Sequence, residues 1–177
     1  MLGLALGSSP AIFKTEIIAA TSRVFLHERR VQSLGPGFKQ DVVAVLSKNK
    51  EGLKVLDGLR DRGGRIRLPD FYMADLGSAG GFSFPILNAI FLDHEKLKGL
   101  LWRLRDLKDA GSRARLIEEN DSILFHEVYH ALQFRKVIQP GQLERFPRQL
   151  TRYLTFELEY EATIAQWLYL HEKLRAD

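Results

Sequence analysis

The chain has 177 residues, of which 26 are basic, 22 are acidic and none is cysteine. This length fits one domain, and 45% hydrophobic with 27% charged residues is typical of a globular protein rather than a disordered one. Without cysteine, disulfides and thiolate nucleophiles are excluded, and a tight transition-metal site must use His, Asp and Glu. The formal charge of +4 is mild and its basic residues are interleaved with acids, so nucleic acid is not an expected partner.

The sequence carries no targeting or membrane signal that can be read. No apolar run approaches the ~20 residues that a membrane-spanning helix requires. The opening segment, Met1 to Gly7, lacks a basic region and is short for a signal peptide. The prediction is therefore a cytoplasmic protein without a membrane partner, although secretion as an effector by a signal-independent machine would leave no trace.

The N-terminal part is predicted to be mainly helical. Apolar residues at helical spacing predict a helix from Ile12 to about Leu34, which Gly35-Pro36-Gly37 would end. Two shorter helices are predicted over Phe38 to Leu46 and over Leu53 to Leu59. The segment Arg65 to Leu68 alternates between polar and apolar residues, which predicts a short strand.

The remaining part mixes a strand with longer helices. Residues 74–84 are rich in Gly and Ser and are predicted to form a loop, and the apolar segment Pro85 to Asp93 is the strongest strand candidate. Helices are predicted from about Glu95 to Lys108, from Arg115 or Asp121 to Val137, and from about Pro147 to Arg175.

These elements predict one helix-rich α+β domain with a small sheet over residues 1–177. Within it we expect a helical N-terminal part at about 10–62 and a catalytic core at about 65–177. Trp102 and Trp167 lie in amphipathic segments and are expected in the core.

A His-Glu-x-x-His pattern lies in the segment ILFHEVYHAL. On a helix, His126 and His130 project from the same face one turn apart, so both imidazoles can reach one ion. Glu127 follows the first histidine, where it can take a proton from a water whose pKa zinc lowers to about 7. The uncharged flanks predict a buried helix, in which such a cluster without a purpose would be costly. The pattern predicts Zn²⁺ on the histidines, with histidines satisfied by hydrogen bonds as the alternative.

A third protein ligand is expected, which leaves the fourth position of the metal to water. The acids that remain as candidates after the motif are Glu144, Glu157, Glu159, Glu161 and Glu172. Glu157 and Glu161 share a helix face, and Glu161 lies in an apolar stripe where it should be buried. Glu159 points elsewhere, into a small and polar setting suited to an ion. Spacing alone does not separate Glu159 from Glu161.

These residues resemble the zincin metallopeptidases, specifically the gluzincin type, whose third ligand is a glutamate on a later helix. His126-Glu127-x-x-His130 matches their motif, and Glu159-x-Glu161-Ala162 resembles the E-x-E-A signature of small bacterial zincin families, including regulatory peptidases that cleave repressors. The resemblance covers about residues 85–165. It implies Glu159 as the third ligand, Glu161 as a residue supporting the ligands, and a substrate-binding edge strand at Pro85 to Asp93.

The resemblance implies a zinc-dependent metalloprotease, an endopeptidase hydrolysing peptide bonds of a restricted protein or peptide substrate, as a regulator or as a delivered effector or toxin. Glu127 would be the general base. Candidate donors to the oxyanion are His94, Tyr72, Tyr153 and Tyr160. The main alternative is a non-catalytic, metal-containing binding or regulatory module with a basic face. A third hypothesis from the same motif is metal-dependent hydrolysis of a non-peptide bond.

Overall fold

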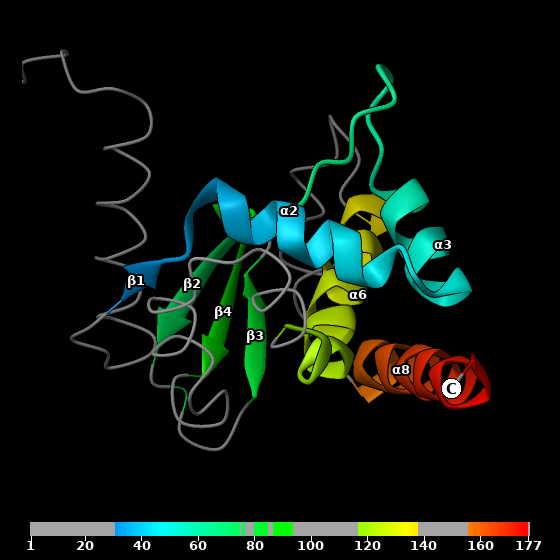
Figure 1. The fold of residues 1–177 in the computed structure, drawn as a ribbon. Coiled ribbons are helices and arrows are strands. Elements are labelled where there is room, and N and C mark those ends of the chain that lie inside the picture. The colour runs from blue at the N-terminus through cyan, green and yellow to red at the C-terminus, as the bar shows by residue number, and fades with distance from the viewer. Residues whose placement is uncertain are drawn as a thin grey trace, which may run out of the picture.

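The computed structural model describes residues 31–74, 76, 80–84, 87–93, 117–137 and 156–176 (Figure 1). Within these ranges the fold is mixed α+β, with helices packed on one four-stranded sheet, as predicted. No helix in these ranges combines the length and the apolar character needed to cross a membrane. Predictions for the segment 95–108, and for Trp102, lie outside the described residues.

The sheet has the strand order β1-β2-β4-β3. Its strands are β1 (Gln32–Ser33), β2 (Asp70–Ala74), β3 (Gly81–Phe84) and β4 (Ala89–Asp93). β2 and β4 are parallel, whereas β1 and β3 run antiparallel to their neighbours. The strand found within Pro85 to Asp93 is therefore internal and paired on both sides, so the prediction of an edge strand there is wrong. β3 forms that edge of the described sheet.

Three of the secondary-structure predictions for this region are wrong. Gln32 and Ser33, expected at the end of a helix, pair with β2 instead. The strand expected at Arg65 to Leu68 is only an isolated bridge between Arg60 and Ile66, and the apolar run that follows it forms β2. Residues 81–84, expected in a loop, form β3, because Phe82 and Phe84 alternate along the segment and pack against the apolar cluster that includes Phe91.

The two predicted short helices are present as α2 (Gly35–Leu46) and α3 (Lys50–Gly58). α2 packs on β2, whereas α3 packs on the two longer helices. The Gly35-Pro36-Gly37 segment starts α2 rather than ending a helix: Pro36 lies in the first turn, where its missing N–H costs no bond, and Gly35 has a φ of +72°. Asn49 caps α3 by accepting two backbone hydrogen bonds.

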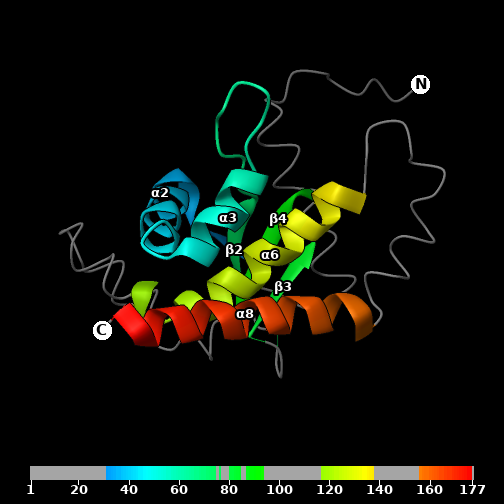
Figure 2. The same cartoon turned by 90° about the vertical axis from the view of Figure 1, so that its right-hand side faces the viewer.

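Two longer helices complete the fold, and α8 crosses α6 (Figure 2). α6 (Asp121–Val137) agrees with the predicted helix, and α8 (Phe156–Ala176) agrees over its described length. One hydrophobic cluster joins α2, α3, the sheet, α6 and α8, and within it the Phe125 and Tyr169 rings stack with their centroids 4.5 Å apart. The two long helices are therefore placed by a common core.

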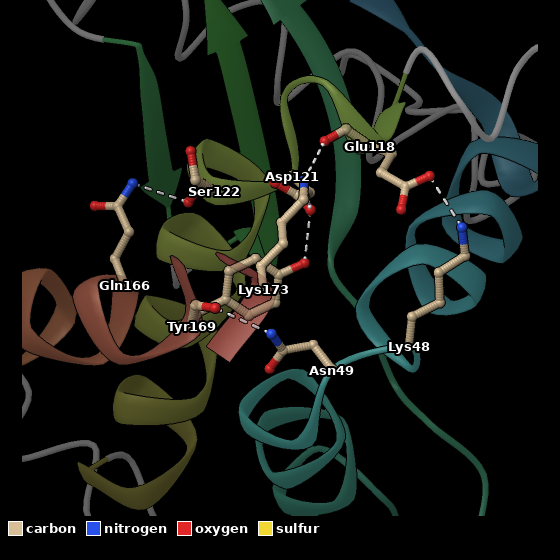
Figure 3. Close-up of polar contacts among 8 residues, drawn as sticks. All are labelled: Lys48, Asn49, Glu118, Asp121, Ser122, Gln166, Tyr169 and Lys173. Atoms are coloured by element: carbon tan, nitrogen blue, oxygen red, sulfur yellow. Dashed lines mark hydrogen bonds and ion pairs between the residues drawn. The ribbon is translucent and has the colours of Figure 1, made fainter. Parts of the chain in front are cut away.

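Polar contacts fix the C-terminal half of α8 against α6 and α3 (Figure 3). The Tyr169 hydroxyl donates to Asp121 Oδ2 at 2.8 Å, and Lys173 Nζ lies 2.7 Å from the same oxygen. Asn49 Nδ2 donates to the Tyr169 carbonyl at 3.0 Å, and Gln166 Nε2 donates to a carbonyl at the start of α6 at 3.0 Å. Because the Asp121 carboxylate is buried, it requires these partners, and they set the position of α8 along α6.

We expect Tyr169→Phe to lower the free energy of unfolding by about 1–3 kcal/mol. The variant keeps the ring on Phe125 but removes the hydroxyl that donates to a buried carboxylate. Chemical denaturation measures the change, and Tyr160→Phe, at an exposed position of the same helix, is the control. Equal effects of the two substitutions would contradict this role for the hydroxyl.

Trp167 is 70% exposed, so its predicted place in the core is wrong. α8 is apolar on two opposite sides: Leu158, Ala162 and Tyr169 face the core, whereas Trp167 and Leu168 lie on the outer side. Helical spacing marks both stripes as apolar but does not say which one the rest of the chain covers.

Candidate metal centre

Three predicted ligands from two helices meet at one point. They are His126 and His130 on α6 and Glu159 on α8. The two imidazole Nε2 atoms lie 3.0 Å apart. Glu159 Oε2 lies 3.4 Å from His126 Nε2, and Oε1 lies 3.3 Å from His130 Nε2. Two nitrogen lone pairs and a carboxylate can therefore be directed at the same point.

The dimensions of this group fit a metal ion. Tetrahedral zinc with nitrogen and oxygen ligands at about 2.0–2.2 Å places pairs of ligand atoms about 3.3 Å apart, and the observed separations are 3.0 to 3.4 Å. Burial, with a smaller effect of His126, lowers the pKa of His130 despite the opposing Glu159 carboxylate, so the ring is neutral near pH 7. Without an ion, a hydrogen on one Nε2 atom would join the two imidazoles in a hydrogen bond, and a bound cation would take the place of that hydrogen.

The burial of α6 explains how the histidines are presented. Leu124, Phe125 and Val128 are fully within the core, as the uncharged flanks of the motif predicted. His130 is 2% exposed and His126 is partly buried, whereas the Glu159 side chain is 55% exposed. Helix α6 therefore presents the two histidines from the core, whereas Glu159 on α8 faces solvent.

Glu127 lies against β3. Its carboxylate accepts a hydrogen bond from the Ser83 backbone N–H, whereas Oε2 is buried and has no hydrogen-bond partner in the described part of the chain. Burial, reinforced by the Glu159 carboxylate, raises the pKa of Glu127 to about 8. In the metal-free chain this carboxyl group is therefore mostly protonated at pH 7, and a cation held beside it would lower its pKa towards the range of a general base.

Gly81 makes this approach of Glu127 to β3 possible. A Cβ atom at position 81 would lie 2.6 Å from Glu127 Cγ and 2.7 Å from Oε1, closer than real Cβ contacts. A side chain here would therefore displace the carboxylate. Gly81 was predicted to lie in a loop, but a glycine within a strand also marks a close approach of the backbone to another group.

Gln133 was not predicted as a site residue. Its Oε1 lies 2.8 Å from His130 Nδ1, and its Nε2 donates to the Leu158 carbonyl at 3.1 Å and to Glu161 Oε2 at 2.9 Å. The prediction that Glu161 is buried is wrong, because the residue is exposed. Its carboxylate contacts Gln133 rather than the histidines. Gln133 follows His130 by one helical turn, and this spacing was the signal available in the sequence.

The other candidates do not join the group. Glu157 is exposed and lies outside it, and Glu172 accepts hydrogen bonds from the first backbone N–H groups of α3. Tyr72 stacks on Phe91 in a cluster separate from the one that contains α6. Tyr160 is exposed on α8. The predictions for Glu144, His94 and Tyr153 fall outside the described residues.

A pocket of about 270 Å³ lies along β3 and the C-terminal half of α6, and neither Glu127 nor the His126–His130–Glu159 group lines it. Its lining includes Ser83, whose backbone N–H donates to Glu127. Phe84, Phe134 and Arg135 form other parts of its wall. The volume is enough for one large side chain of a ligand.

A scan against protein-family models, a search of curated proteins and a search of solved structures return no match for this chain. The site geometry and the sequence motif are therefore the basis for a functional proposal.

Glu159→Gln is expected to weaken zinc binding by more than about 100-fold, since changes behind the ligands alone cost about 10- to 100-fold. The amide removes the charge and one ligating oxygen from the group. Competition with a chromophoric chelator measures the affinity. Glu157→Gln, two positions earlier on α8 and outside the group, is the matched control. A larger loss in Glu157→Gln would move the third ligand to that residue.

Proposed function

We propose that this protein is a zinc-dependent metallopeptidase of the zincin type that hydrolyses peptide bonds of a restricted protein substrate. The main support is that the Nε2 atoms of His126 and His130 and the carboxylate of Glu159 lie 3.0 to 3.4 Å from one another, with Glu127 buried on the same helix as the histidines. Three protein ligands leave a fourth position for water or substrate, as in catalytic rather than structural zinc sites. An unsatisfied carboxylate oxygen close by is what such a site needs as a base.

Zinc at these residues would polarise a carbonyl group and make water nucleophilic near neutral pH. Without metal, the pKa of about 8 leaves Glu127 mostly protonated at pH 7. The positive charge of bound zinc would lower this pKa, so that Oε2 would accept the proton of the attacking water and Glu127 would return it to the departing amine. The Ser83 N–H orients the carboxylate through its other oxygen. Burial keeps His130 neutral, which is the form that binds metal.

β3 is the strand along which an extended peptide would bind, in place of the segment expected from the sequence. Asp93 N donates to the Gly80 carbonyl, so in this antiparallel ladder the backbone groups of Gly81 and Ser83 are directed away from β4. Glu127 lies on this outer side. Because the Ser83 N–H already donates to Glu127, an added peptide would pair with the other outward backbone groups of β3. It would carry its scissile bond past Glu127, with one side chain entering the pocket at Ser83 and Phe84.

Metal content and proteome-wide cleavage together test the proposal. We expect about one zinc per chain, lost in His126→Ala, by elemental analysis. New peptide termini should appear with the wild-type protein and not with Glu127→Gln. Folded protein that binds no zinc would contradict the site, and zinc without new termini would favour the non-catalytic metal-containing module.

A further inference from the structure

Gln133 lies between His130 and helix α8. The sequence motif assigns no role to this residue. Its side chain is buried, with the residue 5% exposed. The carboxamide makes three hydrogen bonds: one with His130 on its own helix and two with the Leu158 carbonyl and Glu161 on α8. A buried side chain with this many partners holds a defined orientation.

The two α8 contacts determine which way the amide points. The Leu158 carbonyl and the Glu161 carboxylate are both acceptors, so the NH₂ group of Gln133 must face them. The oxygen of Gln133 then faces His130 Nδ1 at 2.8 Å. An oxygen can only accept, so Nδ1 must carry the hydrogen of this bond.

This assignment determines the chemistry of the other ring nitrogen. A neutral imidazole with its hydrogen on Nδ1 has a lone pair on Nε2, the atom that lies 3.0 Å from His126 Nε2 and 3.3 Å from Glu159 Oε1. In free histidine the hydrogen prefers Nε2, where it would block a metal. Gln133 therefore holds His130 in the tautomer that can bind an ion.

Gln133 also contacts the segment of α8 that carries the third ligand. Leu158 and Glu161 lie on either side of Glu159, so one amide group holds this turn of α8 while its oxygen orients His130. On the basis of the proposed metal centre, we propose that Gln133 is a positioning residue that prepares His130 and Glu159 together for the metal. Glu161 supports the ligands through Gln133.

The same contacts would arise if Gln133 only fastened α8 to α6. Gln166 provides the matched comparison, since its Nε2 donates to the Ser122 carbonyl at 3.0 Å and joins the same two helices without touching a ligand. Gln133→Leu and Gln166→Leu each remove such a connection. Only Gln133→Leu removes the acceptor of His130 Nδ1.

The tautomer is measured directly on the zinc-free full chain by long-range ¹H–¹⁵N spectra of the histidine rings. We expect the wild-type His130 to carry its hydrogen on Nδ1, and Gln133→Leu to shift it towards Nε2, with Gln166→Leu unchanged. In Gln133→Glu the carboxylate still accepts from Nδ1, so the wild-type tautomer should persist. A hydrogen on Nε2 of His130 in the wild-type protein would overturn the proposal, and this result depends on no variant.

Zinc affinity, measured by chelator competition, completes the test. Gln133→Leu should weaken binding by about 10- to 100-fold, as changes behind the ligands do, while Gln166→Leu should match the wild type. Equal affinities of Gln133→Leu and the wild type would overturn the positioning role. A wild-type chain without zinc affinity would refute the proposed function, and the tautomer of the zinc-free chain would still report on Gln133.

Discussion

Glu127→Gln is expected to lower peptide hydrolysis by about 10²- to 10⁴-fold, the usual contribution of a general base, while zinc stays bound. The amide has the size of the carboxylate but cannot accept a proton from water. Glu127 is not a member of the His126–His130–Glu159 group, so its replacement leaves the ligands in place. The comparison uses kcat/KM on a substrate found by cleavage profiling, with zinc measured in the same samples.

The matched control for this substitution is Glu119→Gln, at an exposed position just before α6. It changes the charge by the same amount near the same helix without reaching the site, and activity should stay at the wild-type value. Loss of zinc together with activity in Glu127→Gln would make Glu127 a ligand rather than the base. Wild-type activity in that variant would contradict the proposed mechanism.

Gly81→Ala is expected to lower kcat/KM by about 100-fold, the effect of misplacing a catalytic group by roughly 1 Å. The added methyl group would lie 2.6 Å from Glu127 Cγ and 2.7 Å from Oε1, so the carboxylate must move. Zinc content should match the wild type, because the atoms nearest to this methyl group belong to Glu127 and not to a ligand. Steady-state kinetics and elemental analysis on the same preparation separate the two effects.

Gly37→Ala is the control for a glycine substitution as such. No atom lies within 4 Å of a Cβ at position 37, and alanine is favoured within a helix. This variant should keep full activity and stability. Wild-type kcat/KM in a folded Gly81→Ala protein would show that β3 does not hold the base, and the placement of substrate along this strand would then fail.

The position of Glu159 depends on contacts at two places along α8. Asp121 holds Tyr169 and Lys173 at the C-terminal half (Figure 3), and Gln133 holds the turn on either side of Glu159. Both sets of partners come from α6, the helix that carries the histidines. Glu159 is therefore placed relative to His126 and His130 by direct contacts between the two helices.

Features that depend on local periodicity could be predicted from the order of the amino acids. Helix α6, its buried face and the shared face of His126 and His130 follow from residues a few positions apart, because a helix repeats every 3.6 residues. The mixed α+β class also followed from the sequence, and the absence of cysteine limited the candidate ligands to His, Asp and Glu. The three acids at 157, 159 and 161 were recognised as a group, but their spacing did not choose among them.

Which surfaces face one another became known from the folded arrangement of the helices and strands. The rotation of α8 against α6 brings Glu159 to the histidines, turns Glu161 towards Gln133, and leaves Trp167 on the outside. Strand order made β3 the edge beside Glu127, although its glycines predicted a loop. These outcomes depend on contacts between segments far apart in the chain, and no local pattern encodes the distance between two such segments.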